Sequence, residues 1–383
     1  MYIYREITPY LERLAKIFPV VLVTGPRQSG KSTLVQEMFP QHLYVNMENP
    51  QEREKAKADM EGFLSRGPMI IDEVQRMPIL LEFVQSIVDR EKTMGQFVLT
   101  GSNQPELFEK VSESLAGRVG IAELMPLSFS ELKGAGLDIS DRNAALYRGF
   151  MPRLHAEDIA PSDLYSSYFR TYVERDVRKL VNVANLDLFE TFVQLLAGRV
   201  GQLVNKQSLA KDVGVSEMTI ARWITVLRTS YIVFPLRPYH NNFGKRITKT
   251  PKIYFADTGL VAYLLGIRSP SDLATHPLMG NIFENMVVAD AFKTQFNCGK
   301  HPNLYFYRNS SGSIEVDLLR EEGPNLYAYE IKASSTFGEH MTRGMRSLAD
   351  IAPNFKRGTV IYSGGTMSPL AVNYSDIKSI MTD

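Results

Sequence analysis

The sequence contains almost no cysteine: Cys298 is the single one among 383 residues. One thiol excludes an internal disulfide framework, and it fits the reducing cytoplasm, which is the location we expect. The six histidines are scattered without the spacing of metal ligands, which argues against a zinc site.

Long apolar runs are missing as well. No stretch approaches the roughly 18 apolar residues of a membrane-spanning helix, so we expect no membrane span. No long apolar segment follows the first six residues, and we expect no signal peptide. Neither sign of charge is in excess, because 43 Lys and Arg residues face 42 Asp and Glu residues. Any contact with nucleic acid must therefore come from a local basic patch.

The segment 20–33, VVLVTGPRQSGKST, joins an apolar strand-like run, a loop bounded by glycines and a helix-forming run. It matches G-x-x-x-x-G-K-[ST] in the context that this motif requires. The glycines let N–H groups point at phosphate oxygens, and the helix directs its positive dipole end at the same anion. The lysine would reach the β- and γ-phosphates of a nucleotide, and the serine would bind Mg²⁺. The predicted nucleotide-binding residues are Gly25, Pro26, Arg27, Gln28, Ser29, Gly30, Lys31, Ser32 and Thr33.

A later strand-like run, residues 68–71, ends in Asp72 and Glu73. Asp72 is predicted to hold the water shell of Mg²⁺, together with Ser32. Glu73 is predicted to polarise the attacking water. One strand-like run, residues 43–47, intervenes in the sequence before the acidic pair. This order indicates the subclass of P-loop ATPases that carry a catalytic glutamate.

The next strand-like run, residues 96–99, also ends in polar residues. Thr100, Ser102 and Asn103 are candidates to sense the γ-phosphate or orient the water, and we favour Asn103 as the catalytic one. Arg118 precedes another strand-like run and is either an arginine finger, in cis or in trans, or a surface salt-bridge residue. A homo-oligomer is a further hypothesis.

A helix-turn-helix pattern begins near residue 208. Residues 209–213 and 217–228 are predicted helices, and Gly214 supplies the turn between them. Strand-like residues 231–234 and a basic segment follow, as in a winged helix. This pattern predicts contacts with double-stranded DNA. A lid or a protein-docking surface is the alternative. The predicted DNA contacts are Thr219, Arg222, Lys245, Arg246 and Lys249.

The C-terminal part contains Asp317, a predicted hairpin, and then Glu330 and Lys332 on one strand face. This pattern resembles the PD-(D/E)xK nuclease core, in which two carboxylates hold a divalent metal and the ammonium orients a water. Glu284, on a predicted helix, could add a further carboxylate. The alternatives are outward-facing charges on half-exposed strands, or a nuclease-like fold without catalysis.

The order of the motifs GPRQSGKS, IIDEVQ, LTGSNQ, SLAGR and PLSFSEL resembles that of bacterial and archaeal AAA-type ATPases with a C-terminal domain of unknown function. The similarity continues through residues 149–152, 172–176 and 250–260, and so covers nearly the whole chain. The resemblance implies ATP binding and hydrolysis.

We therefore expect an α/β protein of three parts. Residues 1–135 form a P-loop ATPase domain with a parallel sheet, residues 136–245 a helical lid and winged-helix region, and residues 246–383 a restriction-endonuclease-like domain. The expected function is Mg²⁺-dependent ATP hydrolysis coupled to DNA binding or processing. The alternative is a regulatory NTPase switch or scaffold whose later domains bind protein and cleave nothing.

Overall fold

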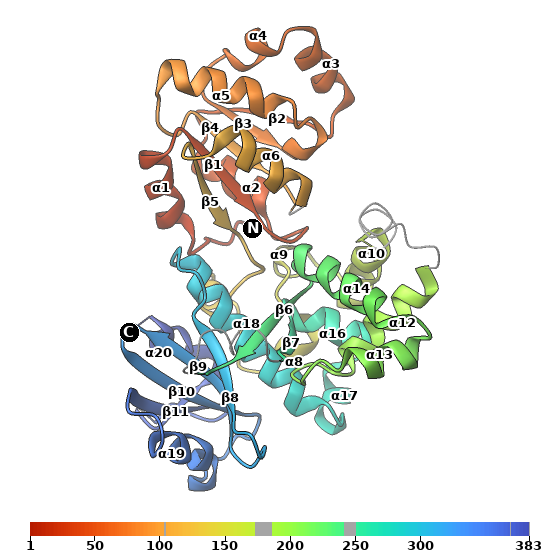
Figure 1. Cartoon of the computed structure of the whole chain (residues 1–383), viewed down its shortest axis with the longest axis vertical. Helices are drawn as coiled ribbons and strands as arrows, with labels where there is room; N and C mark the ends of the chain where they lie inside the picture. Colours follow the sequence, from red (N-terminus) through yellow and green to blue (C-terminus); the bar gives the residue numbers. More distant parts are fainter. Residues whose placement is uncertain (103–104, 173–185, 241–249, 368, 383) are drawn as a thin grey trace.

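The computed structural model describes residues 1–102, 105–172, 186–240, 250–367 and 369–382. These residues form two sheets, one of five strands and one of seven. In Figure 1 the five-stranded sheet and its helices stand above, and the seven-stranded sheet lies below with the remaining helices. The predicted α/β class is confirmed.

The five-stranded sheet is parallel throughout and has the order β2-β3-β4-β1-β5. Strand β1 lies between β4 and β5, and all five of its residues are buried. A continuous apolar run suits a strand that is covered on both faces. The strands are β1 (Val20–Thr24), β2 (Leu43–Asn46), β3 (Met69–Asp72), β4 (Phe97–Thr100) and β5 (Val119–Glu123).

Helices cover both faces of this sheet. Since side chains alternate between the faces along each strand, the apolar strands present apolar side chains to the helices on each face. Val21 and Val23 pack with α1 and α2 on one face. Val20 and Leu22 pack with α4, α5 and α6 on the other. The helices of this unit are α1 (Thr8–Ile17), α2 (Lys31–Met38), α3 (Pro50–Ala58), α4 (Met60–Leu64), α5 (Leu80–Glu91) and α6 (Pro105–Leu115).

Helices dominate the described residues between β5 and the next strand. Two of them, α13 and α14, meet at a tight turn in which Gly214 has left-handed backbone, with φ 80°. Ser216 caps α14 by accepting from the N–H of Thr219. The two predicted helices and their turn are thereby confirmed. The helices are α7 (Phe129–Gly134), α8 (Arg142–Arg148), α9 (Pro152–Ala156), α10 (Pro161–Tyr172), α12 (Leu186–Ala197), α13 (Lys206–Val213) and α14 (Glu217–Thr229).

The larger sheet joins an antiparallel ribbon, β6 with β7, to the C-terminal strands, since β6 also pairs with β8. The strand order is β12-β11-β10-β9-β8-β6-β7. The division predicted at residue 245 therefore falls between two paired strands and does not separate two sheets. The strands are β6 (Val233–Pro238), β7 (Lys252–Phe255), β8 (Leu304–Arg308), β9 (Glu315–Glu322), β10 (Asn325–Lys332), β11 (Phe355–Tyr362) and β12 (Ala371–Asn373).

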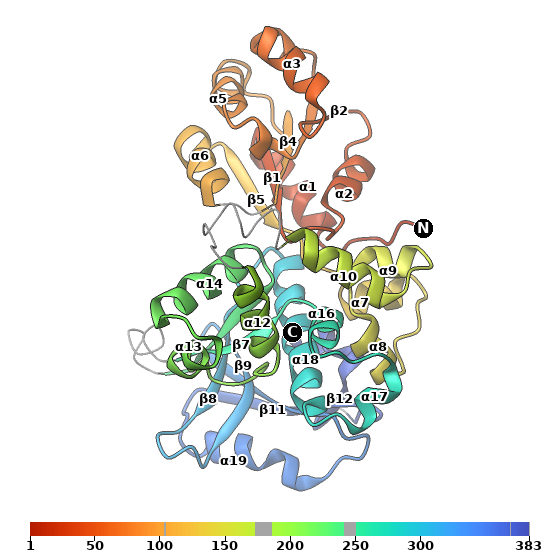
Figure 2. The same ribbon diagram turned by 90° about the vertical axis from the view of Figure 1, so that its right-hand side faces the viewer.

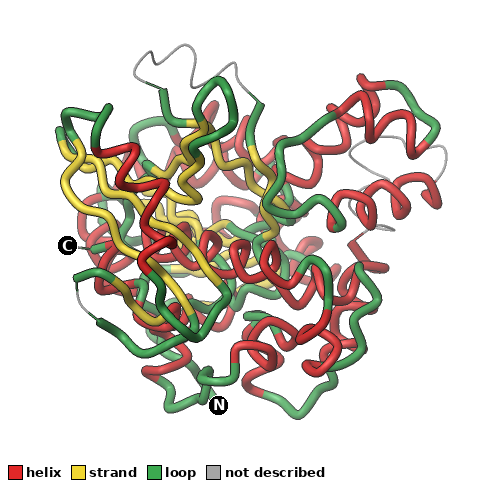
Figure 3. The backbone as a smooth tube through the Cα atoms, turned by 90° about the horizontal axis from the view of Figure 1, so that it is seen from below, coloured by secondary structure: helices red, strands yellow, loops and turns green. Residues whose placement is uncertain are grey.

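Helix α18 (Met279–Asn297) is buried on most sides and packs against β7, β10 and the end of β5. Figures 1 and 2 show it between the upper unit and the larger sheet. Seen from below, the strands gather on the side where the C-terminus is marked (Figure 3). No helix of the described residues is long and apolar enough to span a bilayer. The remaining helices are α16 (Thr258–Leu264), α17 (Pro270–Thr275), α19 (Arg343–Ala349) and α20 (Lys378–Met381).

Candidate nucleotide-binding site

The phosphate loop, residues 25–30, connects β1 to α2, and two glycines determine its shape. Gly25 has φ 143°, and a Cβ at this position would lie 2.2 Å from the carbonyl oxygen of Leu124. Only glycine fits there. Gly30 has φ 89° and is the last residue before α2. The free N–H groups at the start of α2 and its positive dipole end therefore face the loop, which is the arrangement of an anion site.

The Lys31 side chain lies within this loop. Its Nζ donates to the carbonyl oxygens of Pro26 at 2.7 Å and Gly25 at 3.2 Å. Burial lowers the pKa of Lys31 to about 8, and the nearby Glu73 carboxylate opposes this shift. A phosphate at the loop would stabilise the charged ammonium and raise this pKa again. The loop thus holds a partly desolvated cation for an anionic ligand.

Asp72 and Ser32, the two predicted metal residues, lie together at the carboxyl end of β3. Ser32 Oγ is 3.0 Å from each carboxylate oxygen of Asp72. The hydroxyls of Tyr44 and Thr100 also donate to this carboxylate, Tyr44 at 2.6 Å. A hydroxyl beside a carboxylate is a hard oxygen donor set, which fits Mg²⁺. Sequence reasoning missed Tyr44, because its contact depends on the pairing of β2 with β3.

Glu73 follows β3 in the left-handed backbone conformation, with φ 56°. Its carboxyl group lines the same pocket as Lys31. Burial raises its pKa, and the Lys31 ammonium opposes this rise. Gln75 Nε2 donates both to the Glu73 carboxylate and, at 3.2 Å, to Ser102 Oγ. Gln75, which the sequence reasoning missed, thus joins the acidic strand end to the end of β4.

Thr100 and Ser102, two of the three polar candidates at the end of β4, lie among the described residues. Thr100 contacts Asp72 directly and also accepts from the N–H of Glu73 at 3.3 Å. Ser102 Oγ accepts from Gln75 Nε2, which also donates to the Glu73 carboxylate. Asn103, the residue favoured from the sequence, lies outside the described residues, so its catalytic role stays a prediction.

A pocket of about 590 Å³ opens beside the phosphate loop, a size typical of small-molecule sites. Glu73 and the phosphate loop form one wall, and the N-terminal residues Met1, Tyr2, Ile3 and Arg5 form another. Helices α9 and α10 supply the third wall. These helices belong to residues 136–245, where the sequence predicts a helical lid, but the sequence did not single out the residues that line the pocket. Its residues are Pro152, Arg153, Ala156, Glu157, Tyr168 and Thr171.

Arg118 does not reach this pocket. Its guanidinium pairs with the Asp89 carboxylate of α5 at 2.5 and 2.8 Å, and its carbonyl accepts from the N–H of Val20. Arg118 therefore lies at the amino end of β1, whereas the phosphate loop follows the carboxyl end. Within this chain Arg118 forms a salt bridge at the edge of the sheet opposite the phosphate loop, which argues against a finger in cis, and its role as a finger in trans stays a prediction.

The predicted nuclease residues come together on β9 and β10. Lys332 Nζ donates to Asp317 at 3.0 Å and to Glu330 at 2.7 Å. Burial raises the pKa of Glu330 to about 8, with the Asp317 carboxylate adding to the shift. Glu284 of α18 instead accepts from Lys252 Nζ at 3.1 Å, and Lys252 also pairs with Glu315 at 2.7 Å. The sequence placed Lys252 in the basic segment of the predicted winged helix and did not connect it with these carboxylates.

Two lysines lie among these carboxylates. Within the described part of the chain, no group of three or more His, Cys, Asp or Glu side chains is placed to hold a metal ion. The ammonium groups of Lys252 and Lys332 are paired with the carboxylates instead. The nuclease role of Asp317, Glu330, Lys332 and Glu284 therefore stays a prediction.

The helix-turn-helix surface is exposed where the DNA contacts were predicted. Arg222 is exposed and Thr219 is half-buried, on the first turns of α14. Met218 beside them is 75% exposed. Lys245, Arg246 and Lys249 lie outside the described residues.

The parallel sheet, the phosphate loop and the acidic end of β3 together define a P-loop NTPase domain. Residues 18–133 match the family described as AAA domain, residues 139–271 the domain of unknown function DUF8612, and residues 279–380 the domain of unknown function DUF4143. Over 373 residues the chain is 33% identical to an uncharacterised protein of Mycobacterium tuberculosis, covering 96% of this chain and 81% of that protein. An uncharacterised protein of Haemophilus influenzae is 24% identical, with 88% of each covered. The chain belongs to the same family as the mycobacterial protein.

Two solved structures are similar at a lower level. A Walker-type ATPase of Pyrococcus abyssi has a TM-score of 0.44 at 15% identity, covering 68% of this chain and 94% of its own. A single-substitution variant of RuvB from Thermotoga maritima has a TM-score of 0.30 at 18% identity, covering 60% of this chain and 87% of its own.

Proposed function

We propose that the protein binds ATP with Mg²⁺ in the pocket beside the phosphate loop and hydrolyses it. One observation carries this proposal: Lys31, Ser32 and Glu73 all line a single pocket, and Asp72 touches Ser32. A cation, a metal-binding hydroxyl–carboxylate pair and a second carboxylate are the set that phosphoryl transfer to water requires.

Each side chain has a distinct role in this proposal. Lys31 neutralises the charge of the terminal phosphates, and the loop N–H groups orient them. Ser32 and Asp72 hold Mg²⁺, which offsets the charge of the phosphate oxygens. Glu73 accepts a hydrogen bond from the attacking water and aligns it with the terminal phosphorus. The raised pKa of Glu73 makes it a better proton acceptor than an exposed carboxylate.

Titration calorimetry of the full chain with ATP tests this function. We expect heat of binding with Mg²⁺ and a steady release of phosphate that stops when EDTA removes the metal. The same titration with GTP distinguishes the base. No heat with either nucleotide would overturn the proposal.

The proposed coupling is to double-stranded DNA. Three features support it: helices α13 and α14 meet at a tight turn, the ribbon β6–β7 follows, and an isolated bridge joins Leu203 to Lys252. This is the element order of a winged helix, in which the second helix of the turn contacts DNA. Exposed Arg222 lies on that helix. The second candidate is a protein-docking surface, which the 75% exposed Met218 favours.

A salt series separates the two candidates. If α14 binds the DNA backbone, the logarithm of affinity falls linearly with the logarithm of salt concentration. Arg222→Ala is expected to reduce this slope by about 1, since one phosphate contact is lost. Arg90→Ala on α5 is the control, because it removes an exposed arginine from the other unit. Duplex binding with no salt dependence, or an unchanged slope in Arg222→Ala, would favour protein docking.

Phosphodiester cleavage is not part of the proposed function. The carboxylates of Asp317, Glu330 and Glu284 pair with the two ammonium groups of Lys332 and Lys252. No group of three or more His, Cys, Asp or Glu side chains among the described residues is placed to hold a metal ion. The ion pairs of Lys252 tie β7 to α18 and to the C-terminal strands. DNA from the salt series, incubated with Mg²⁺ and run on a gel, is accordingly expected to stay intact.

A further inference from the structure

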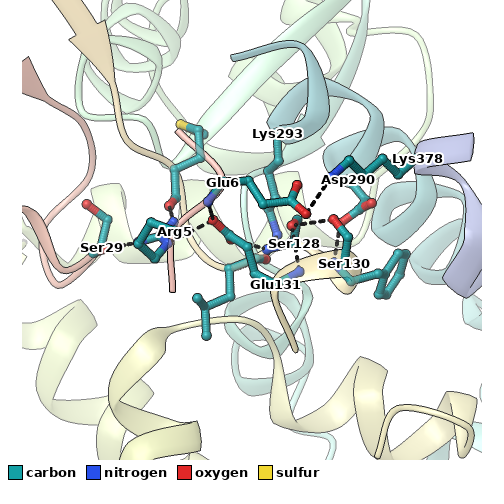
Figure 4. A network of polar contacts seen from close by, with 12 residues as sticks. Arg5, Glu6, Ser29, Ser128, Ser130, Glu131, Asp290, Lys293 and Lys378 are labelled. Atoms are coloured by element: carbon teal, nitrogen blue, oxygen red, sulfur yellow. Dashed lines mark hydrogen bonds and ion pairs between the residues drawn. The ribbon is translucent and has the colours of Figure 1, made fainter. Parts of the chain in front are cut away.

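Arg5 is almost fully buried, with 3% of its surface exposed, and binds three partners at once. Its Nη1 donates to the carbonyl oxygen of Ser29 at 2.7 Å, within the phosphate loop. Its Nη2 donates to the carbonyl oxygen of Met125 at 2.6 Å, and its Nε pairs with the Glu131 carboxylate at 3.0 Å. Figure 4 shows Arg5 with its contacts to Ser29 and Glu131. The planar guanidinium fork makes these contacts simultaneously, which a lysine ammonium on one flexible stem cannot.

The contact with Ser29 determines the direction of a neighbouring donor. The carbonyl of Ser29 and the N–H of Gly30 belong to one planar trans peptide, so they point in opposite directions. By holding the carbonyl, Arg5 fixes the direction of the Gly30 N–H in the loop that would receive a phosphate. Arg5 also lies close to Gly30 itself, since a Cβ on that residue would be 3.6 Å from Nη1.

The other two contacts of Arg5 lie on residues 125–131, which we call the connector. Glu131 is the central group: its carboxylate accepts from Arg5, from the N–H of Glu6 at 2.8 Å and from the N–H of Ser128 at 2.8 Å. It also completes a capping box with Ser128 at the start of α7. Arg5 thus joins the phosphate loop to the first helix that follows the five-stranded unit.

Two side chains of helix α18 form hydrogen bonds with the backbone of the same connector. Asp290 accepts from the N–H of Phe129 at 2.8 Å, and Lys293 Nζ donates to the carbonyl of Leu127 at 2.9 Å. The two side chains are three residues apart and share one face of the helix. Figure 4 shows them opposite Arg5 and Glu131. Further along, Asn285 of α18 binds the backbone of Phe255 in β7.

We infer that Arg5 is a positioning residue. It couples the conformation of the phosphate loop to the packing of α18 against the connector. This inference rests on the proposed function, since it takes the loop to receive the phosphates of ATP. A ligand that selects one direction of the Ser29–Gly30 peptide also selects the Arg5 geometry that holds Met125 and Glu131. Because such coupling is reciprocal, a connector that is held in place by α18 raises the affinity of the loop for the ligand.

The experiment compares full-length wild type with Arg5→Lys and Lys293→Met. It measures MgATP affinity by calorimetry and amide hydrogen exchange of residues 125–131 with and without MgATP. In the wild type, MgATP is expected to slow exchange in the connector. Arg5→Lys should weaken binding about tenfold, within the usual range of coupling between sites, and should abolish this protection. Lys293→Met, whose side chain does not line the pocket, should weaken binding about threefold, a smaller effect because it acts only through the connector.

Arg320→Lys is the matched control, because Arg320 is also buried, at 2% exposed, but pairs with Glu322 and Tyr329 in the C-terminal sheet. It should lower the melting temperature and leave MgATP affinity unchanged. The coupling would be refuted if Arg5→Lys bound MgATP within twofold of wild type and MgATP still slowed hydrogen exchange fully in the connector. If Arg5→Lys does not fold, unchanged affinity in Lys293→Met refutes it equally. Absence of MgATP binding in the wild type would instead overturn the proposed function itself.

Discussion

Lys31→Ala is expected to bind MgATP at least about 30-fold more weakly than the parent protein and to release phosphate no faster than a no-enzyme blank. The 30-fold figure corresponds to roughly 2 kcal/mol, a low value for removing one partner of a desolvated charge pair. The loss should be large because the Lys31 ammonium is buried and has backbone carbonyls of the loop as its hydrogen-bond acceptors. Calorimetry and phosphate release measure the two effects.

The pH dependence of binding provides an internal check on this assignment. The pKa of Lys31 is lowered by burial to about 8. Bound phosphates favour the charged ammonium, so above pH 8 binding must take up a proton. MgATP affinity should therefore fall by up to about tenfold per pH unit above that value, and Lys31→Ala should lose this dependence. Lys16→Ala, which removes an exposed charge from α1, should behave like the parent. If parent and Lys31→Ala bound MgATP equally well, the phosphate loop would not be part of the nucleotide-binding site.

Structural features that depend only on residues close together in the sequence could be predicted from the sequence. The phosphate loop needs two glycines at positive φ and a helix start, and both lie within one short segment. Helices α13 and α14 and the β9–β10 hairpin were likewise predictable, because each combines a local periodicity with a local turn. Asp317, Glu330 and Lys332 could be brought together from strand alternation and one hairpin.

Contacts that depend on the arrangement of distant elements could not be predicted. Tyr44 reaches Asp72 only because β2 lies beside β3, and Arg5 reaches Ser29 from a segment that carries no motif. The case of Arg118 is different. In a parallel sheet, a residue before a strand lies at the opposite edge from a loop that follows a strand. Its place before β5 therefore already argued against a finger in cis, and the pairing with Asp89 agrees.

The sequence correctly placed Glu73 at a strand end but gave an incomplete reason for its orientation. Strand alternation stops at Asp72, and the left-handed backbone of Glu73 turns the chain into a 3-10 turn. Left-handed conformations of residues other than glycine are strained and concentrate at functional sites. Gln75, two residues later, then holds the carboxylate by a hydrogen bond. The strained backbone and the oriented carboxylate together make Glu73 the most sharply testable of the proposed catalytic residues.

Glu73→Gln is expected to bind MgATP within about threefold of the parent and to hydrolyse it about 100- to 10,000-fold more slowly, which is the usual contribution of a general base. The glutamine amide keeps the size of the side chain and an oxygen that can accept from Gln75, so the pocket stays intact. It cannot accept a proton from the attacking water. Rapid-quench or steady-state phosphate release measures the rate, and calorimetry measures the binding.

The control is Glu48→Gln, because the Glu48 carboxylate lies near enough to raise the pKa of Glu73 but does not line the pocket. It should retain turnover close to that of the parent. The pH profile distinguishes a base from a structural carboxylate. Burial raises the pKa of Glu73, so hydrolysis by the parent should increase with pH above the usual carboxylate range, as the base loses its proton. That rising limb should vanish in Glu73→Gln. If Glu73→Gln kept both the hydrolysis rate and its increase with pH, another group at the pocket would have to be the catalytic base.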